Sequence, residues 1–363
     1  MNRFSLEALL ELSSIPLIGP TRLRKLISVL GSPEAVMEAS FRQLVGIEGI
    51  DRKTAERIKQ GPDKAFVKTQ LQKIKEYDVQ VLSYWDDAYP DSLKRIYDPP
   101  AFLFYKGKPD ALQVPAIAVV GTRVPSNYGK LVTEKFVRTL AQNHFAIISG
   151  FARGVDSIAH KTALQNNAFT IGVLGNGIDV IYPPENKQLF EQIVEKGIIL
   201  TEYFMGTPPD SGNFPKRNRI ISGISVGVLV TEAGAKSGAL LTAMYANDQN
   251  REVFAVPASV LTPKSAGCHK LLKEGATLAE HPEEIIEILE PQIQLRREKA
   301  TRPDPKLSGA LKKIYDVLSA DPLHVDQIAI QTGLSSAETL SSLLTLELMG
   351  LIRQMAGKMF VRL

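Results

Sequence analysis

The sequence predicts an α/β protein whose centre is a doubly wound, mostly parallel sheet. Between about residues 115 and 290, short apolar runs such as "AIAVVGTR" and "VGVLVTEAG" end in glycine-containing loops and alternate with helical segments. These runs are continuous rather than alternating in polarity, as expected of parallel strands that are buried on both faces. The segments before this region predict a small helical domain, and those after it predict a winged helix.

Length and composition set broad limits. A chain of 363 residues predicts two or three domains with at least one large core. No apolar run approaches the roughly 18 residues that cross a bilayer. The first residues, "MNRFSLEALLELSS", carry acidic side chains within the apolar stretch and lack the small-residue cleavage site of a signal peptide. We therefore expect a cytoplasmic protein without a membrane contact.

Cysteine usage and net charge add two more limits. Cys268 is the only cysteine, so no internal disulfide is expected, and His269 beside it lacks the further ligands of a zinc site. We expect neither a metal nor a cofactor. The net charge of +4 is mild, so contact with a polyanion depends on where Lys and Arg are placed.

Residues 1–75 predict a helix-hairpin-helix-like (SAM-like) helical domain. Two segments, "IPLIGPTRLRKLISVLG" and "LVGIEGIDRKTAERIKQG", place an apolar, glycine-containing turn before a helix. The first turn of such a helix exposes backbone N–H groups that suit a phosphate oxygen. The domain is interpreted either as a module that binds a nucleic-acid backbone or as a structural scaffold without nucleic-acid contact. The basic residues beside the two helix starts are Arg22, Arg24, Lys25, Arg52 and Lys53.

Residues 76–290 are assigned to one Rossmann-like domain. It begins with a lead-in that contains strands at 79–84 and 101–105. Right-handed crossovers through helices are expected to connect the later strands. These helices are expected at 129–142, 157–165, 186–195 and 240–250.

The end of the chain predicts a linker and a winged helix. Residues 291–308 hold three prolines and five basic residues with almost no apolar content, which is typical of a linker. Residues 309–363 follow the winged-helix pattern, with a turn at Thr332 and Gly333. The helix after this turn, which in such domains enters the DNA major groove, has no Lys or Arg. We expect a protein-contact or spacer role for this domain.

Chemistry is expected in the loops that follow the strands of the central sheet. In open α/β sheets ligands bind beyond the carboxyl ends of the strands, so these loops should converge on one pocket. They are rich in glycine and in cations, which suits a phosphorylated ligand. The loops are "GTRVPSNYG", "SGFARGVDSIAH", "GNGIDVIYPPENK", "FPKRNR" and "EAGAKSGALLTA", with the cations Arg123, Arg153, Lys187, Lys216, Arg217, Arg219 and Lys236.

Nucleotide-binding and catalytic patterns are weak in these loops. Neither the dinucleotide fingerprint G-x-G-x-x-G nor the Walker pattern is complete. Carboxylates near a phosphate pocket can activate water, but the structural interpretation is stronger. Asp156 and His160 are expected to hydrogen bond to each other, and Glu232 is expected to pair with an Arg. The loop-borne acid–base candidates are Asp156, His160, Asp179 and Glu232.

Several long motifs in one order resemble the DNA-processing protein A family, also called Smf. They cover about residues 89–278 and include "VVGTRVPSNYG", "IISGFARGVDSIAH", "FPKRNRIISGIS" and "LVTEAGAKSGALLTAMYANDQNREVFAVP". The resemblance implies a homodimer that binds single-stranded DNA without sequence preference, protects incoming strands in natural transformation and loads the RecA recombinase, without catalytic turnover. Two departures are Ala258, where the family commonly has glycine, and Cys268-His269, where an Asn is common.

The same resemblance implies which residues meet the DNA. Its phosphate pocket maps onto Arg123, Ser149, Gly150, Gly154, Lys187, Arg217, Asn218 and Arg219. Further contacts are expected from Gly121, Arg153, Lys216, Lys236 and Phe214. Loop aromatics that could stack on bases are Tyr128, Phe151, Phe204 and Phe214, of which half are expected in the core.

Two alternatives stay open beside single-stranded DNA binding. A nucleotide-cleaving enzyme of the phosphoribohydrolase type has a similar pocket, and it would release free base from nucleoside monophosphates. A transcription regulator whose central domain senses a ligand would leave a footprint on one particular duplex.

Overall fold

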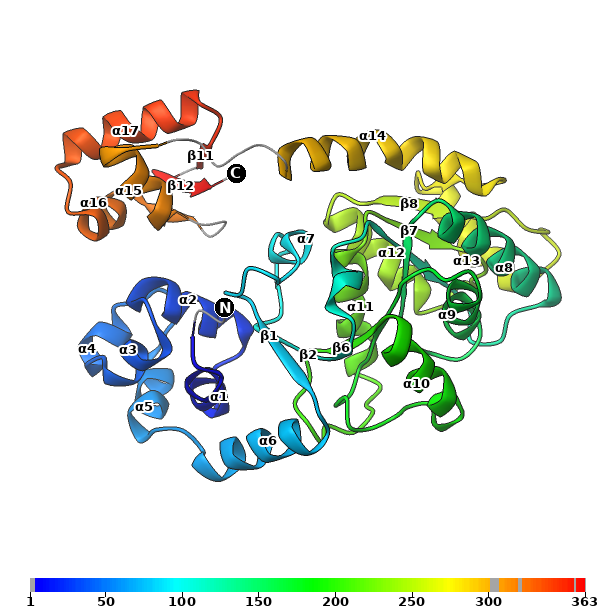
Figure 1. Cartoon of the computed structure of the whole chain (residues 1–363), viewed down its shortest axis with the longest axis horizontal. Helices are drawn as coiled ribbons and strands as arrows, with labels where there is room; N and C mark the ends of the chain where they lie inside the picture. The colour runs from blue at the N-terminus through cyan, green and yellow to red at the C-terminus, as the bar shows by residue number, and fades with distance from the viewer. Residues whose placement is uncertain (1–3, 301–306, 319–321, 356, 363) are drawn as a thin grey trace. The chain divides into compact units, whose positions relative to one another are not determined.

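The computed structural model describes residues 4–300, 307–318, 322–355 and 357–362, and the chain forms two compact units (Figure 1). Met1–Leu295 combines the N-terminal helices with a nine-stranded sheet, and Arg296–Leu363 holds the winged helix. The α/β fold class expected from the sequence is confirmed. None of the helices in the described part of the chain is both long and apolar enough to cross a membrane.

The N-terminal domain consists of six helices around an aliphatic core. The first predicted hairpin begins its helix with Pro20 after Gly19, and Asp51 caps the second by accepting a hydrogen bond from the Thr54 N–H. Leucines such as Leu10, Leu12 and Leu26 are completely buried between the helices. The helices are α1 (Leu6–Ser14), α2 (Pro20–Leu30), α3 (Pro33–Glu38), α4 (Phe41–Val45), α5 (Arg52–Gln60) and α6 (Lys64–Glu76).

The central sheet has the strand order β1-β2-β6-β5-β4-β3-β7-β8-β9. The pairs β1–β2 and β2–β6 are antiparallel, and all the other neighbours are parallel. The strands are β1 (Gln80–Ser83), β2 (Phe102–Gly107), β3 (Ala116–Val120), β4 (Ala146–Ser149), β5 (Thr170–Val173), β6 (Ile198–Thr201), β7 (Gly227–Val230), β8 (Glu252–Ala255) and β9 (Thr277–Leu278).

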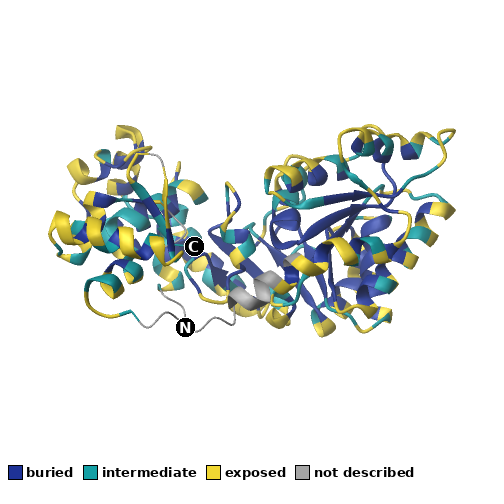
Figure 2. Cartoon of the chain, turned by 90° about the horizontal axis from the view of Figure 1, so that it is seen from above, coloured by how far each residue is buried: buried dark blue, intermediate teal, exposed yellow. Residues whose placement is uncertain are grey.

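Helices cover both faces of this sheet, and its parallel strands are almost entirely buried (Figure 2). Along β3, Ile117 and Val119 pack with α8, α9 and α14, whereas Ala118 and Val120 pack with α11, α12 and α13. The α-helices of this domain are α7 (Asp91–Lys94), α8 (Asn127–Gln142), α9 (Val155–Gln165), α10 (Lys187–Lys196), α11 (Asn213–Ile224), α12 (Ala239–Asp248), α13 (Ala266–Lys273) and α14 (Pro282–Ala300). Three short 3₁₀ helices are η1 (Pro109–Leu112), η2 (Pro184–Asn186) and η3 (Pro263–Ser265).

The strand order reverses between β3 and β7. From β3 the chain proceeds through β4, β5 and β6 toward one edge, and after β6 it crosses by α11 to β7 on the other side of β3. The loops after β3 and β7 therefore separate from each other at the carboxyl end of the sheet. Such a switch point is where open α/β sheets form their ligand crevice.

The N-terminal domain is bound to the central domain by polar contacts. The side chain of Gln70 donates to the Met205 carbonyl (3.2 Å) and accepts from the Met205 N–H (2.9 Å). Asp98 accepts a hydrogen bond from Thr21 at the start of α2 (3.0 Å) and faces the guanidinium of Arg24 (3.8 Å). A carboxylate of the chain itself thus contacts side chains in the first turns of the first hairpin helix, which favours the scaffold interpretation for that hairpin.

The second unit has the expected winged-helix topology. Its three-stranded antiparallel sheet has the order β10-β12-β11, and Gly333 in the left-handed region ends α16 as expected at the turn. Of the linker expected at 291–308, residues 291–300 continue helix α14 and residues 301–306 lie outside the described residues. The elements of this unit are α15 (Gly309–Val317), β10 (Leu323–His324), α16 (Val325–Thr332), α17 (Ser336–Leu348), β11 (Ile352–Met355) and β12 (Met359–Arg362).

Candidate functional site

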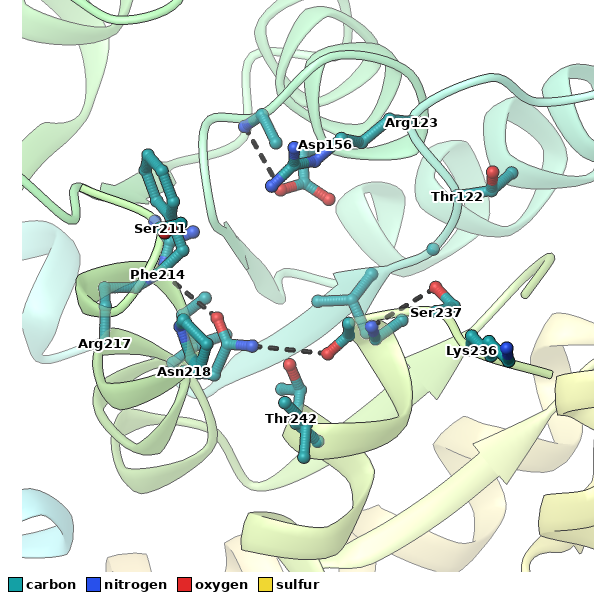
Figure 3. Close-up of a pocket in the computed structure, with 18 of the residues that line it drawn as sticks. Thr122, Arg123, Asp156, Ser211, Phe214, Arg217, Asn218, Lys236, Ser237 and Thr242 are labelled. Atoms are coloured by element: carbon teal, nitrogen blue, oxygen red, sulfur yellow. Dashed lines mark hydrogen bonds between the residues drawn. The ribbon is translucent and has the colours of Figure 1, made fainter. Parts of the chain in front are cut away.

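A cavity of about 780 Å³ opens at the switch point of the sheet (Figure 3). It is enclosed by the loops after β3 and β7 and by the first turns of α9, α11 and α12. Backbone N–H groups at the start of helices carry partial positive charge, which favours an anionic ligand here. The polar and charged lining residues are Thr122, Arg123, Asp156, Tyr182, Ser211, Arg217, Asn218, Lys236, Ser237 and Thr242.

Arg217 is the buried cation of this cavity, with 5% of its surface exposed. Its Nη1 donates to the carbonyl oxygens of Gly150 (2.6 Å) and Val173, which lie at the ends of β4 and β5. Its Nε donates to Asn218 Oδ1 (3.2 Å). Burial lowers the pKa of Arg217 to about 10, so the guanidinium remains charged at neutral pH. Arg217 therefore ties α11 to two strand ends and places a positive charge at the cavity wall.

Gly150 and Asp156 complete the surroundings of this guanidinium. A Cβ on residue 150 would lie 2.5 Å from Arg217 Nη2 and 2.8 Å from Asp156 Oδ2, so only glycine fits at this position without displacing these side chains. Asp156 accepts a hydrogen bond from the Ala152 N–H (3.2 Å). Burial raises the pKa of Asp156, and the charge of Arg217 partly opposes this effect. The buried carboxylate thus holds the loop after β4 and balances the buried cation.

An exposed cation and two aromatic rings form one side of the cavity. The Arg123 guanidinium lies 5.8 Å from the centroid of the Phe214 ring. The rings of Phe214 and Tyr182 are stacked, with centroids 5.8 Å apart and planes 26° apart. Arg123, Tyr182 and Phe214 also line a second, smaller recess next to the cavity. The arrangement offers a positive charge and an aromatic surface side by side, which suits a ligand that has both phosphates and bases.

The structure brings most of the sequence-predicted residues to these two recesses. Gly121, Arg123, Phe214, Arg217, Asn218 and Lys236 line the cavity, and Gly150 and Arg153 line the smaller recess. The Asn218 amide donates to the Gly238 carbonyl at the start of α12 (3.3 Å), as drawn in Figure 3. Arg153 is exposed and pairs with Glu185.

The segment "FPKRNR" is helical, which corrects the expectation of a loop. It forms the first turns of α11, and the helical period puts Phe214, Arg217 and Asn218 on the side of the cavity. Lys216 and Arg219 line neither recess. Arg219 forms ion pairs with Glu202 (2.6 Å) and with Asp98 (3.7 Å). It therefore fixes the position of α11 and does not line the cavity.

Three further residues expected at the phosphate pocket lie outside both recesses. Ser149 is completely buried and its hydroxyl donates to the Val119 carbonyl (2.7 Å). Gly154 has a positive φ of 76° and packs against the backbone of the loop after β3, so it shapes that loop. Lys187 is exposed in the first turn of α10.

The residues considered as acid–base candidates have structural partners, and for His160 and Glu232 these partners differ from the expected ones. His160 contacts Thr170 Oγ1 (2.7 Å) rather than Asp156, and burial lowers the pKa of His160 to about 3. Glu232 accepts hydrogen bonds from the N–H (2.8 Å) and hydroxyl (2.5 Å) of Ser126 rather than from an Arg. Asp179 pairs with Lys73 of α6 (3.3 Å).

The four expected aromatic platforms divide in half between surface and core, as the sequence predicted. Phe214 lines the cavity as expected, and Tyr128 is exposed with its hydroxyl donating to the Pro257 carbonyl (2.6 Å). Phe151 is buried in the hydrophobic core, and the partly buried Phe204 packs against it. Tyr182 was not among the predicted aromatic platforms, although it lies within the predicted strand-end loop "GNGIDVIYPPENK". Its place at the cavity becomes evident only from its stacking on Phe214.

The two departures from the family pattern contact each other. His269 Nε2 lies 2.8 Å from the Ala258 carbonyl oxygen, and Cys268 is buried with a pKa raised to about 11. Within the ranges that the structure describes, there is no group of three or more His, Cys, Asp or Glu side chains placed to hold a metal ion.

Comparison with known proteins identifies three matching families along the chain. Residues 80–290 match the DNA recombination-mediator protein A family, residues 298–358 match its winged-helix domain, and residues 9–61 match the SAM-like helix-hairpin-helix tandem. Protein Smf from Synechocystis is 35% identical over 96% of this chain and 97% of its own length. The DNA processing protein DprA from Streptococcus pneumoniae is 43% identical over 62% of this chain and 77% of its own length.

Two solved structures resemble the chain. DNA processing protein A from Streptococcus pneumoniae has a TM-score of 0.69 and 37% identity, and the match covers 78% of this chain and 98% of that one. A structure that concerns the single-stranded DNA binding mode of DNA processing protein A from Helicobacter pylori has a TM-score of 0.54 and 32% identity. That match covers 59% of this chain and 96% of the other.

Substitution of Gly150 tests the packing around Arg217. We expect Gly150→Ala to lower the free energy of unfolding by about 1–3 kcal/mol, because the added methyl group overlaps a guanidinium that cannot move without losing its carbonyl partners. Gly238→Ala is the matched control, since a Cβ there meets nothing within 4 Å. Urea unfolding of both variants measures the difference, and equal stabilities would contradict this account of Gly150.

Proposed function

The chain belongs to the DNA recombination-mediator protein A family, and on this premise we propose that it binds single-stranded DNA without sequence preference. The strand lies over the cavity at the switch point, with phosphates near Arg123, Arg217 and Lys236 and with bases near Phe214 and Tyr182. The observation that carries this proposal is the contact of Arg123 with the stacked Phe214–Tyr182 pair at the rim of a cationic cavity.

The side chains in the cavity suit backbone recognition more than base readout. A guanidinium presents a planar fork to phosphate oxygens, and hydroxyls such as Thr122, Ser211 and Ser237 supply neutral hydrogen bonds. Aromatic rings stack on any base, with about 1–3 kcal/mol for each stacked base. The proposed binding is therefore tolerant of sequence.

We propose binding without turnover. The carboxylates nearest the cavity are engaged in holding loops: Asp156 with the Ala152 N–H, and Glu232 with Ser126. A general base must instead reach a proton of the substrate or of a water molecule. These contacts support a DNA-holding protein over the phosphoribohydrolase alternative.

Replacement of Arg123 tests where the DNA binds. We expect Arg123→Ala to weaken binding of oligo-dT and of mixed-sequence oligonucleotides by a similar factor. It should also flatten the slope of log affinity against log salt by about 0.7, the contribution of one phosphate contact on a single strand. Fluorescence anisotropy at several salt concentrations measures both effects.

Arg138→Ala is the matched control for Arg123→Ala. It removes the same charge from an exposed position on α8 that does not line the cavity. We expect its salt slope to stay closer to the wild-type value. If both variants changed affinity and slope equally, binding would depend on total charge and the assignment of the cavity would be wrong.

We further propose that the protein forms a homodimer through the central domain, near α12. Met244 and Leu241 on this helix are 47% and 37% exposed, although both are apolar. A twofold dimer would place two cavities in series along one strand. We expect the wild type to sediment as a dimer, Met244→Asp as a monomer, and the control Leu131→Asp, which changes an exposed leucine of α8, as a dimer. A monomeric wild type would contradict this proposal.

In the cell, we propose that the protein acts in the cytoplasm, protects incoming strands in natural transformation and delivers them to RecA. This rests on the family to which the chain belongs. We expect the protein to shorten the lag before RecA forms filaments on single-stranded DNA that is covered by a single-strand binding protein, and we expect Arg123→Ala to shorten it less. RecA ATP hydrolysis reports the lag. An unchanged lag with the wild type would refute loading but not DNA binding.

A further inference from the structure

Helix α17 of the winged helix has an exposed row of leucines. Leu340, Leu344 and Leu348 follow one another at intervals of four residues and are 53%, 59% and 81% exposed. The opposite side of the same helix packs Leu343 and Leu346 into the core of this unit. A helix that is apolar on both sides is normally covered on both.

The row does not suit a DNA groove. Helix α17 follows the turn of the helix-turn-helix, the position from which winged helices contact bases, yet it contains no Lys or Arg. Its charged residues are Glu338 and Glu347, and residues 310–363 carry five basic and five acidic residues. DNA-binding surfaces need clustered cations for the phosphates. A protein surface therefore suits the leucine row better than DNA does.

The spacing of the row suits another helix with the same row. Side chains four residues apart form a ridge along a helix, and two such ridges interdigitate when helices cross at about −50°. In an antiparallel pair centred on Leu344, each Leu340 faces the Leu348 of the second copy. A twofold interface requires this kind of self-complementary surface.

The charges beside the row allow such a pair. In the antiparallel arrangement, Glu347 lies opposite Ser341 and Glu338 lies opposite Gly350, so no carboxylate faces another. Both glutamates also accept hydrogen bonds within their own chain, Glu338 from the Ser335 N–H and hydroxyl and Glu347 from the Gln354 N–H. A parallel pair would set Glu347 against Glu347, and antiparallel helix dipoles attract.

The size of the row indicates how strong the contact is. Three leucines with these exposures offer less than half of the roughly 800 Å² per partner that a stable interface buries. The row is therefore too small to dimerise the protein from dilute solution. It becomes effective where copies are held close together, as on one DNA strand, because tethering raises the local concentration to about the millimolar range.

We propose that the leucine row of α17 is a self-association surface, at which the winged helices of two copies pair antiparallel about a twofold axis at Leu344. This pairing is separate from the proposed contact near α12. It would link copies of the protein that are bound along a single strand.

Cysteine cross-linking of the full-length chain tests the pairing. The native Cys268 is fully buried, so only the introduced surface cysteine is expected to form an intermolecular disulfide. We expect Leu344→Cys to form a disulfide-linked dimer at least tenfold faster than Ile330→Cys, a control that is 80% exposed on α16. The reaction is run with and without long poly-dT, and rates are expected to rise on the DNA. Equal rates for the two variants under both conditions would overturn the proposal.

Two further variants test the register. A mixture of the Leu340→Cys and Leu348→Cys proteins should give the mixed dimer faster than either protein cross-links with itself. Adding Leu340→Asp to the Leu344→Cys protein should slow its cross-linking, whereas random collision would be unaffected. Fast self-linking of Leu348→Cys would overturn the antiparallel pairing. DNA binding is measured separately with Arg123→Ala, so a failure of the cavity assignment is distinguishable from a failure here.

Discussion

The burial of one guanidinium organises the candidate site. Arg217 is nearly removed from solvent and keeps its charge, so its surroundings must supply hydrogen-bond acceptors and a counter-charge. The carbonyls at the ends of β4 and β5 are the acceptors, and the buried Asp156 is the nearby anion. Gly150 is required because a side chain would fill the space of this guanidinium. The positions of two strand ends and of α11 therefore depend on one another.

Helix α11 connects the cavity to the N-terminal domain. Its cavity side carries Phe214, Arg217 and Asn218, and its rear carries Arg219. Arg219 pairs with Asp98, which also accepts a hydrogen bond from Thr21 at the start of α2. The helical domain thus supports the helix that supplies Phe214 and Arg217, two of the five proposed DNA contacts. These contacts give the hairpin module a structural role.

The charged residues near the cavity divide into two functions. Among the described residues, no carboxylate forms an ion pair with Lys236 or with the exposed Arg123, so both cations can face an anionic ligand. The carboxylates are occupied with hydrogen bonds that hold loops in place, as Glu232 is with Ser126. Helix α17 of the winged helix differs from the cavity, because it exposes a row of leucines and contains no Lys or Arg. The central domain is thus suited to a polyanion, and the winged helix is suited to protein contact.

The sequence by itself determined the fold class, the cationic loops and their convergence, because continuous apolar runs predict parallel strands and parallel strands end at the same edge of a sheet. Only the tertiary structure decided which cations face the cavity. The sequence of "FPKRNR" is compatible both with a loop and with the first turns of a helix. Because the segment is helical, its period places Arg217 at the cavity and Arg219 next to Asp98. Ser149, Glu232 and Tyr182 took their roles from partners far away along the chain, and no local pattern specifies such partners.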